Sequence, residues 1–150
     1  MAWVEGTETA SLTIDAEFDD VVAFFCDPQQ FKAAYELLES CEEIESEVWR
    51  WVLIEKREKG ITYQADYTVE YTRDDNELTW ITREGNMRSE GKTVVRQNSG
   101  GVQVDYTETL ATDLPIPKLA AKVFRPIVAR EIRHGVRGFL DRSKEILESG

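Results

Sequence analysis

One acidic side chain of this sequence stands where a carboxylate is unusual, on the apolar face of an expected strand. Glu108 is in phase with Val102, Val104, Tyr106 and Leu110, whose alternation predicts a buried strand face. A carboxyl group in an apolar pocket has a raised pKa and can serve as an acid, a base or a ligand anchor. A strand end or a bulge would instead turn it outward, so Glu108 is a candidate only, and no catalytic residue is assigned.

Aromatic side chains form a second group that could bind a ligand. Tyr63, Tyr67 and Tyr71 occupy odd positions of a segment whose even positions are polar, so they share one expected face. Their rings offer a large apolar area with a polar tip, which suits a planar cyclic ligand, although they could also simply pack beneath a helix. The candidate ligand-binding residues are Trp49, Trp51, Tyr63, Tyr67, Tyr71, Trp80, Met87, Tyr106, Glu108, Phe124, Val128, Ile132 and Val136.

Other reactive residue types point to no further site. His134 is the single histidine and lies on an arginine-bearing helix face, so we expect it to be exposed and without a catalytic partner. Cys26 is expected to be buried and Cys41 exposed. Together with His134 they cannot supply the four ligands of a structural zinc site. We therefore expect neither a metal nor a cofactor.

Composition narrows the class of protein. The chain has 150 residues, 41% of them hydrophobic and 31% charged, which is typical of one folded domain spanning residues 1–150. The net charge of -11 argues against nucleic acid as a partner. The longest apolar run, residues 21–26, is too short to cross a membrane, and the first residues do not resemble a signal peptide. We expect a cytoplasmic protein without stable membrane insertion.

The first forty residues predict one strand and two short helices. Ala10, Leu12 and Ile14 alternate with polar residues, as in a half-buried strand. Asp15 is the expected cap of a helix over residues 18–25, which the Asp27-Pro28 pair should end. A second short helix is expected to place Phe31, Ala34 and Tyr35 on its inner side.

From Ser40 to about residue 113 the pattern is that of strands separated by turns. The clearest strand extends over residues 61–72, with a period of two that continues without interruption. The expected turns are residues 58–60, 74–76, 84–86 and 98–101. Closely spaced turns of this kind indicate a meander of consecutive antiparallel strands.

The period then changes to that of a helix. From Pro117 the stripe contains Leu119, Val123, Phe124 and further apolar residues, and beyond Pro126 it continues to Ile146. Pro126 removes a backbone donor and is expected to kink or restart the helix there. We therefore predict an α+β fold. A curved antiparallel sheet of about six to seven strands wraps around a long C-terminal helix, two short helices follow the first strand, and a cavity lies between sheet and helix.

This order of elements resembles the START/Bet v 1-like (SRPBCC, helix-grip) superfamily, and within it the polyketide cyclase/dehydrase and coenzyme Q-binding-like branch. The likeness extends over nearly the whole chain. It is carried by residues 12–16 leading into 18–28, by residues 67–71, by Leu78-Thr79-Trp80 with the glycines that follow, and by residues 114–117. The resemblance implies the fold and a cavity for a hydrophobic, cyclic small molecule such as a lipid, quinone or polyketide.

Three functions follow from these observations and stay open. The first is binding of a hydrophobic, cyclic or aromatic small molecule. The second, implied by the resemblance, is a polyketide cyclase or dehydratase that uses cavity tyrosines and Glu108. The third is a protein-interaction module, or a homodimer, that uses the basic face formed by Arg130, Arg133 and Arg137, because residues 116–150 contain eight Lys and Arg against four Asp and Glu.

Overall fold

A computed structural model of the chain describes residues 2–149. The strands are β1 (Ala2–Ile14), β2 (Leu38–Glu45), β3 (Val48–Leu53), β4 (Lys56–Glu58), β5 (Ile61–Tyr63), β6 (Asp66–Asp74), β7 (Glu77–Gly85), β8 (Met87–Asn98) and β9 (Gly101–Leu114). The α-helices are α1 (Phe18–Phe25), α2 (Pro28–Phe31) and α3 (Ala121–Ser149), with single 3-10 turns η1 (Lys32–Ala34) and η2 (Lys118–Ala120).

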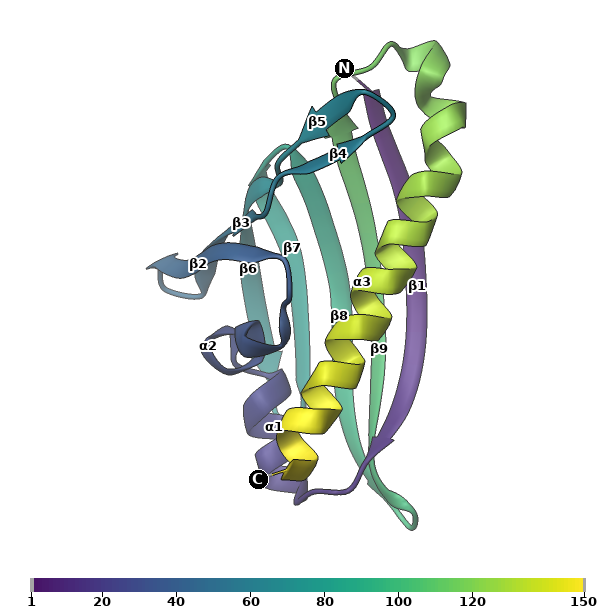
Figure 1. The fold of residues 1–150 in the computed structure, drawn as a ribbon. Helices are drawn as coiled ribbons and strands as arrows, with labels where there is room; N and C mark the ends of the chain where they lie inside the picture. Colours follow the sequence, from purple (N-terminus) through teal and green to yellow (C-terminus); the bar gives the residue numbers. More distant parts are fainter. Residues whose placement is uncertain (1, 150) are drawn as a thin grey trace.

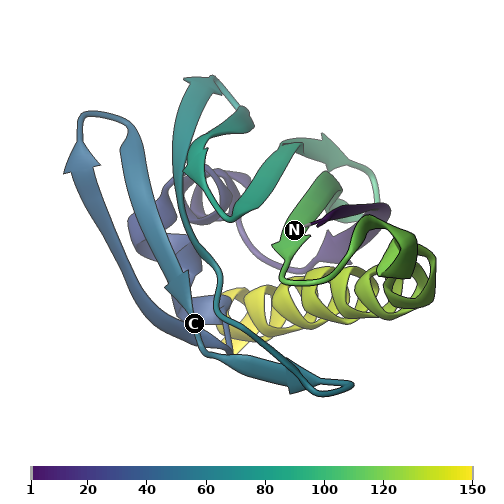
Figure 2. The same cartoon turned by 90° about the horizontal axis from the view of Figure 1, so that it is seen from above.

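Seven of these strands form an antiparallel sheet in the order β1-β9-β8-β7-β6-β3-β2, and β4 and β5 form a separate two-stranded hairpin. Strand β1 pairs with β9 from Ala2 opposite Leu114 to Ile14 opposite Val102, so the first strand and the last lie side by side. The sheet curves around α3, which runs diagonally across its concave face (Figure 1), and Figure 2 shows the sheet folding around that helix. The predicted α+β fold, with its long C-terminal helix and its short helices after the first strand, is confirmed.

Helix α3 approaches β1 closely at one glycine. A Cβ atom on Gly6 would lie 2.8 Å from Cδ1 of Ile132, so any side chain at this position would require the end of the Ile132 side chain to move. The buried face of α3 presents Phe124, Val128, Ile132 and Val136 toward the sheet. This spacing of about one helical turn is the pattern that the sequence showed.

The strand expected over residues 61–72 is divided, which corrects that prediction. Strand β5 ends at Tyr63 and pairs only with β4, while β6 begins at Asp66 and pairs with β3. Asn86 occupies the break: its side-chain amide donates to the Gln64 carbonyl at 2.7 Å and accepts from the Asp66 amide at 2.9 Å. These bonds give the backbone groups of Gln64 and Asp66 hydrogen-bond partners where no neighbouring strand supplies them. The alternation of apolar and polar residues can therefore continue across the bend between β5 and β6.

Two further details of the N-terminal half differ from expectation. Asp15 does not cap α1; the N-cap residue is Glu17, which makes no side-chain capping bond. The capping aspartate is Asp27, whose carboxylate accepts from the Gln29 amide at 3.0 Å and starts α2 with Pro28 in its first turn. The Asp27-Pro28 pair therefore opens a helix as well as following one.

Pro126 does not restart α3, so the expectation of an interrupted helix is wrong. The helix continues from Ala121 to Ser149 with Pro126 inside it. Pro126 cannot donate to the Lys122 carbonyl, but this turn is exposed and water can bind that oxygen, so the loss is tolerated. Leu119, expected on the buried stripe, is 94% exposed in η2, and Val123 is 55% exposed, because the stripe that faces the sheet begins at Phe124.

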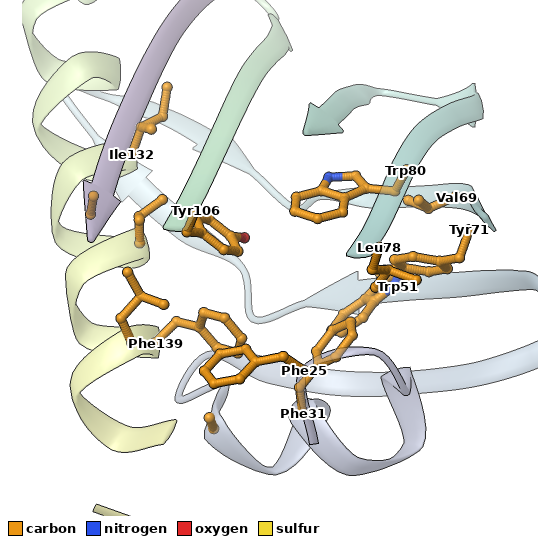
Figure 3. Close-up of a cluster of buried hydrophobic side chains, with 14 of the residues drawn as sticks. Phe25, Phe31, Trp51, Val69, Tyr71, Leu78, Trp80, Tyr106, Ile132 and Phe139 are labelled. Atoms are coloured by element: carbon orange, nitrogen blue, oxygen red, sulfur yellow. The ribbon is translucent and has the colours of Figure 1, made fainter. Parts of the chain in front are cut away.

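Aromatic rings pack together at the end of the sheet that α1 and α2 cover. There Phe31 stacks on Trp51 with ring centroids 6.0 Å apart and planes at 11°, and it also meets Phe139 of α3 edge to face. Figure 3 shows these rings together with Phe25 and Trp80, filling the space between the helices and the sheet. This half of the concave face is therefore solid core.

Within residues 2–149, no helix has the length and apolarity that crossing a bilayer requires.

Candidate functional site

A cavity of about 310 Å³ lies between α3 and the concave face of the sheet. Its walls come from the central strands, from the cavity-facing side of α3 and from the β4–β5 hairpin, so each is held by an element fixed elsewhere in the fold. Most of the wall is aliphatic or aromatic. The cavity is therefore a largely apolar site, with few polar groups available to orient a guest.

Most of the candidate ligand-binding residues contribute to this wall. They are Tyr63, Tyr67, Met87, Tyr106, Glu108, Phe124, Val128, Ile132 and Val136. The strand alternation and the helical spacing place them on facing surfaces, as expected for sheet and helix positions that share a core. Their role toward a ligand is taken up below as a proposal.

The remaining aromatic candidates lie outside the main cavity. Trp51, Tyr71 and Trp80 surround a separate void of about 20 Å³ in the solid half of the fold. Trp49 lies on the concave side near α2, with the Lys32 ammonium 5.7 Å from its ring centroid. The cause is the pair of short helices, whose Phe25 and Phe31 fill the volume that these tryptophans would otherwise face. Alternation identified the correct sheet face but could not show which part of it the helices cover.

Glu108 points inward and is only 8% exposed. Its Oε2 accepts a hydrogen bond from the Ser89 hydroxyl at 2.6 Å, and its Oε1 accepts from the Tyr106 hydroxyl at 3.1 Å. The Trp80 indole N–H donates to Ser89 Oγ at 2.9 Å behind it. Glu108 lines both the main cavity and the small inner void, so this network lies where the two meet.

Burial governs the acidity of these groups. Desolvation raises the pKa of Glu108, and the hydrogen bonds from Ser89 and Tyr106 only partly oppose it. Desolvation also raises the pKa of Tyr67 and Tyr106 well above the usual tyrosine value, with the Glu108 charge adding to the effect. Both tyrosines are therefore neutral hydroxyl groups at any physiological pH. Such a site can donate and accept hydrogen bonds inside an apolar wall.

Charged residues lie at the mouth of the cavity, where they form pairs. Lys56 of β4 and Glu131 of α3 are joined at 2.7 Å, and Arg130 approaches Glu58 at 3.8 Å, so the hairpin is tied to the helix. At the other side of the mouth Arg142 contacts Glu36 at 3.2 Å and donates to the Ala34 carbonyl at 2.6 Å. These ion pairs span the opening between α3 and the segments that face it.

Several wall residues were not among the candidates. Leu110 and Phe139 could have been chosen, since the first is in phase with Glu108 and the second continues the stripe of α3. Leu53 ends β3, and Ile61 is in phase with Tyr63. Tyr35, Leu37 and Ile54 come from loops, whose position periodicity does not indicate. Their inclusion required the three-dimensional path of residues 32–63.

The other residues singled out from the sequence have simple positions. His134 is exposed at the rim of the cavity. Cys26 is buried as expected, but Cys41 is buried too, which corrects the expectation of an exposed thiol, because its strand packs over the aromatic core. Across residues 2–149, histidine, cysteine and acidic side chains nowhere gather in a group of three that could hold a metal ion.

The basic face of α3 contacts acidic groups of the same chain. Arg137 lies 3.1 Å from Glu8 of β1, in addition to the pairs that Arg130 and Arg142 form at the mouth. Much of the charge asymmetry along the sequence is thus balanced within the fold. A protein partner for this face stays a prediction.

The fold is shared with solved structures of low sequence similarity. The Thermus thermophilus protein TTHA0849 is 22% identical with a TM-score of 0.68, covering 96% of this chain and 95% of that one. A START superfamily protein of Mycobacterium smegmatis is 10% identical with a TM-score of 0.65, covering 97% of both chains. The di-domain ARO/CYC protein StfQ of steffimycin biosynthesis is 12% identical with a TM-score of 0.65, over 97% of this chain and 51% of its own. No family model and no curated protein matches the sequence.

Proposed function

We propose that this protein, which has the START/Bet v 1-like helix-grip fold, binds a hydrophobic, ring-containing small molecule in the cavity between its sheet and α3. The observation that carries the proposal is the apolar cavity of about 310 Å³, which lies within the size range of small-molecule sites. The protein would act as a carrier, a chaperone or a sensor for that molecule.

The walls favour a ring over a flexible chain. Tyr67 and Tyr106 of the sheet lie opposite the aliphatic side chains of α3, and Phe139 packs against Tyr106 with ring centroids 5.7 Å apart. A flat guest would therefore have rings on one side and branched side chains on the other. Aromatic faces gain from such contacts beyond the burial of apolar area. Among the polar atoms of the wall, the hydroxyls of Tyr67 and Tyr106 and the carboxyl of Glu108 would orient the guest.

The test uses a neutral reporter, N-phenyl-1-naphthylamine, whose emission rises on entering an apolar site. We expect saturable binding to the wild-type protein. Val128→Trp would fill the cavity from α3 and abolish binding, because Val128 is buried in its wall. The matched control is Val123→Trp, which places the same side chain on the same helix at an exposed position and should leave binding intact.

Circular dichroism on both variants shows whether they stay folded. Native mass spectrometry of freshly purified protein would additionally reveal any molecule retained from the host. Absence of binding by the reporter and of any retained molecule, or binding that Val128→Trp leaves unchanged in a folded protein, contradicts the proposal.

A second candidate function rests on Glu108. A buried carboxyl with a raised pKa beside a neutral tyrosine hydroxyl, inside a ligand-sized cavity, has the properties of a general acid–base group. It could protonate a departing hydroxyl and accept a proton from carbon, as dehydration of a β-hydroxy ketone requires. The test is turnover of an aromatic β-hydroxy ketone to the conjugated enone, followed by absorbance. Activity that is lost in Glu108→Gln supports an enzyme, and no turnover in the wild type contradicts it.

A further inference from the structure

The charged residues of the cavity wall are matched with one exception. Glu36, Glu58 and Glu131 each lie within ion-pair distance of an arginine or lysine. Lys56 and Arg142 each lie within ion-pair distance of a glutamate. Glu108 has no such partner among residues 2–149, since both groups that hydrogen-bond it are neutral. It is also the most deeply buried of these carboxyl groups. The inner end of the cavity therefore lacks a positive charge that the rest of the wall possesses.

The hydrogen bonds around Glu108 all run in the same direction. Ser89 Oγ accepts a hydrogen bond from the Trp80 N–H and donates its own proton to Glu108 Oε2. The Tyr106 hydroxyl donates to Oε1. Each carboxylate oxygen can accept more than one hydrogen bond. The network thus directs its donors at the carboxyl and leaves acceptor capacity on Glu108, which faces the cavity.

We infer that Glu108 is a specificity-determining residue: among hydrophobic ligands it selects those that carry a hydrogen-bond donor, a protonated amine above all, and it disfavours anionic ones. The inference rests on the proposed function, because it names the class of ligand for the same cavity. An ammonium group would supply the missing positive charge and bond to the free acceptor positions. A carboxylate ligand would place a second negative group in a poorly solvated site with no cation to balance it.

The test compares four ligands that share one ring system. They are 2-methylnaphthalene, 2-naphthylmethanol, 2-naphthylmethylamine and 2-naphthoate, titrated by isothermal calorimetry at neutral pH. We expect the amine to bind at least about tenfold more tightly than the naphthoate, since a charge-assisted hydrogen bond corresponds to roughly 10- to 100-fold in affinity. The alcohol should lie between these two.

Variants assign the preference to Glu108. Glu108→Gln keeps the size of the side chain and removes its charge, so the ratio of amine to naphthoate affinity should fall by about tenfold. The matched control is Glu90→Gln, the same replacement on β8 at an exposed position, and it should leave the ratio unchanged. The wild-type order of affinities is a test in itself, should Glu108→Gln fail to fold.

The failure of this inference can be told apart from failure of the proposed function. If 2-methylnaphthalene binds while the amine has no advantage over the naphthoate, the selectivity is wrong and the binding function stands. The same holds if a folded Glu108→Gln protein keeps the full preference. If none of the ligands binds, both proposals fall.

Discussion

The indole N–H of Trp80 donates to the Ser89 hydroxyl at 2.9 Å, and that hydroxyl in turn donates to Glu108 at 2.6 Å. Trp80 does not line the main cavity, yet its hydrogen bond holds the Ser89 hydroxyl in position beside the carboxyl of Glu108. Trp80, a core residue, thereby orients Glu108. Within residues 2–149, Glu108 is the single acidic residue of the cavity wall that has no ion-pair partner. The core and the candidate site are coupled at this point.

The first prediction concerns Ser89. Ser89→Ala would leave both the Trp80 N–H and Glu108 Oε2 without this partner in a buried setting, at a cost of about 1–3 kcal/mol in the free energy of unfolding. Urea denaturation measures the loss. Ser99→Ala, at an exposed position in the β8–β9 turn, is the control and should change stability by less than about 0.5 kcal/mol. Equal stability of the two variants would show that the network does not stabilise the fold.

The second prediction concerns pH. Burial raises the pKa of Glu108 in the folded protein above its ordinary value of 4.5, so between these two values the folded state holds a proton that the unfolded state has lost. Stability must therefore fall as pH rises through this window, by about 1.4 kcal/mol for each unit of pKa difference. Below pH 4.5 both states are protonated, so stability no longer changes with pH through this group.

Glu108→Gln isolates this contribution. We expect the stability of the wild type relative to Glu108→Gln to decrease from acidic toward neutral pH, as followed by urea denaturation at several pH values. Other titrating groups are common to both proteins and cancel in the difference. A difference that does not change with pH, or that grows in favour of the wild type, would contradict a raised pKa.

Much of the architecture was predictable because its signals are local. Strand alternation placed Tyr67, Tyr106 and Glu108 on one sheet face, and helical spacing placed Val128, Ile132 and Val136 on one helix face. The apolar face of the sheet and the apolar face of the helix must both be buried, so they have to pack against each other. This predicts the packing of the helix on the sheet without any knowledge of contacts.

The misplaced residues depend on long-range geometry. Tyr71 and Trp80 have the same alternation as Tyr67, but α1 and α2 cover their part of the sheet, so they line core instead of cavity. The break after Tyr63 depends on Asn86, more than twenty residues away, whose side chain replaces a strand partner. Leu119 is apolar and in register with a helix, yet η2 lies beyond the edge of the sheet. Periodicity indicates which residues share a face of a strand or helix. It does not indicate which other element of the fold covers that face.

The third prediction follows from the unbroken helix at Pro126. Pro126→Ala would restore a backbone N–H able to donate to the Lys122 carbonyl and would relieve the ring's clash with the preceding turn. We expect the free energy of unfolding to rise by about 1–3 kcal/mol, up to the difference between proline and alanine inside a helix. Thermal denaturation at fixed protein concentration measures the change.

Pro117 provides a control of opposite sign. Its φ of -64° is the value proline prefers, so Pro117→Ala gains nothing in the folded state and increases the freedom of the unfolded chain. A loss of about 0.4–1 kcal/mol is expected. If Pro126→Ala also destabilises the protein, the proline must be supporting the native course of α3.

The fourth prediction concerns the mouth of the cavity, where Lys56 and Glu131 join the β4–β5 hairpin to α3 at 2.7 Å. Lys56→Glu would place like charges across the opening, with Glu58 nearby on the same strand, and should hold the hairpin away from the helix. Exposed ion pairs contribute only about 0.2–1 kcal/mol, so we expect ligand dissociation to become a few-fold faster while overall stability barely changes. Stopped-flow displacement of bound N-phenyl-1-naphthylamine measures the rate.

The charge-swapped double variant Lys56→Glu with Glu131→Lys restores an attraction across the mouth and should bring the rate back toward the wild-type value. Lys92→Glu is the matched control, because Lys92 also forms an ion pair of 2.7 Å, with Glu77, away from the cavity wall. High salt should shrink the difference between Lys56→Glu and the wild type, since both charges are partly exposed and become screened. If Lys92→Glu accelerates dissociation as much as Lys56→Glu does, net charge controls ligand exchange and the hairpin is not a gate. If neither variant changes the rate, the ligand leaves by a route that does not pass this ion pair.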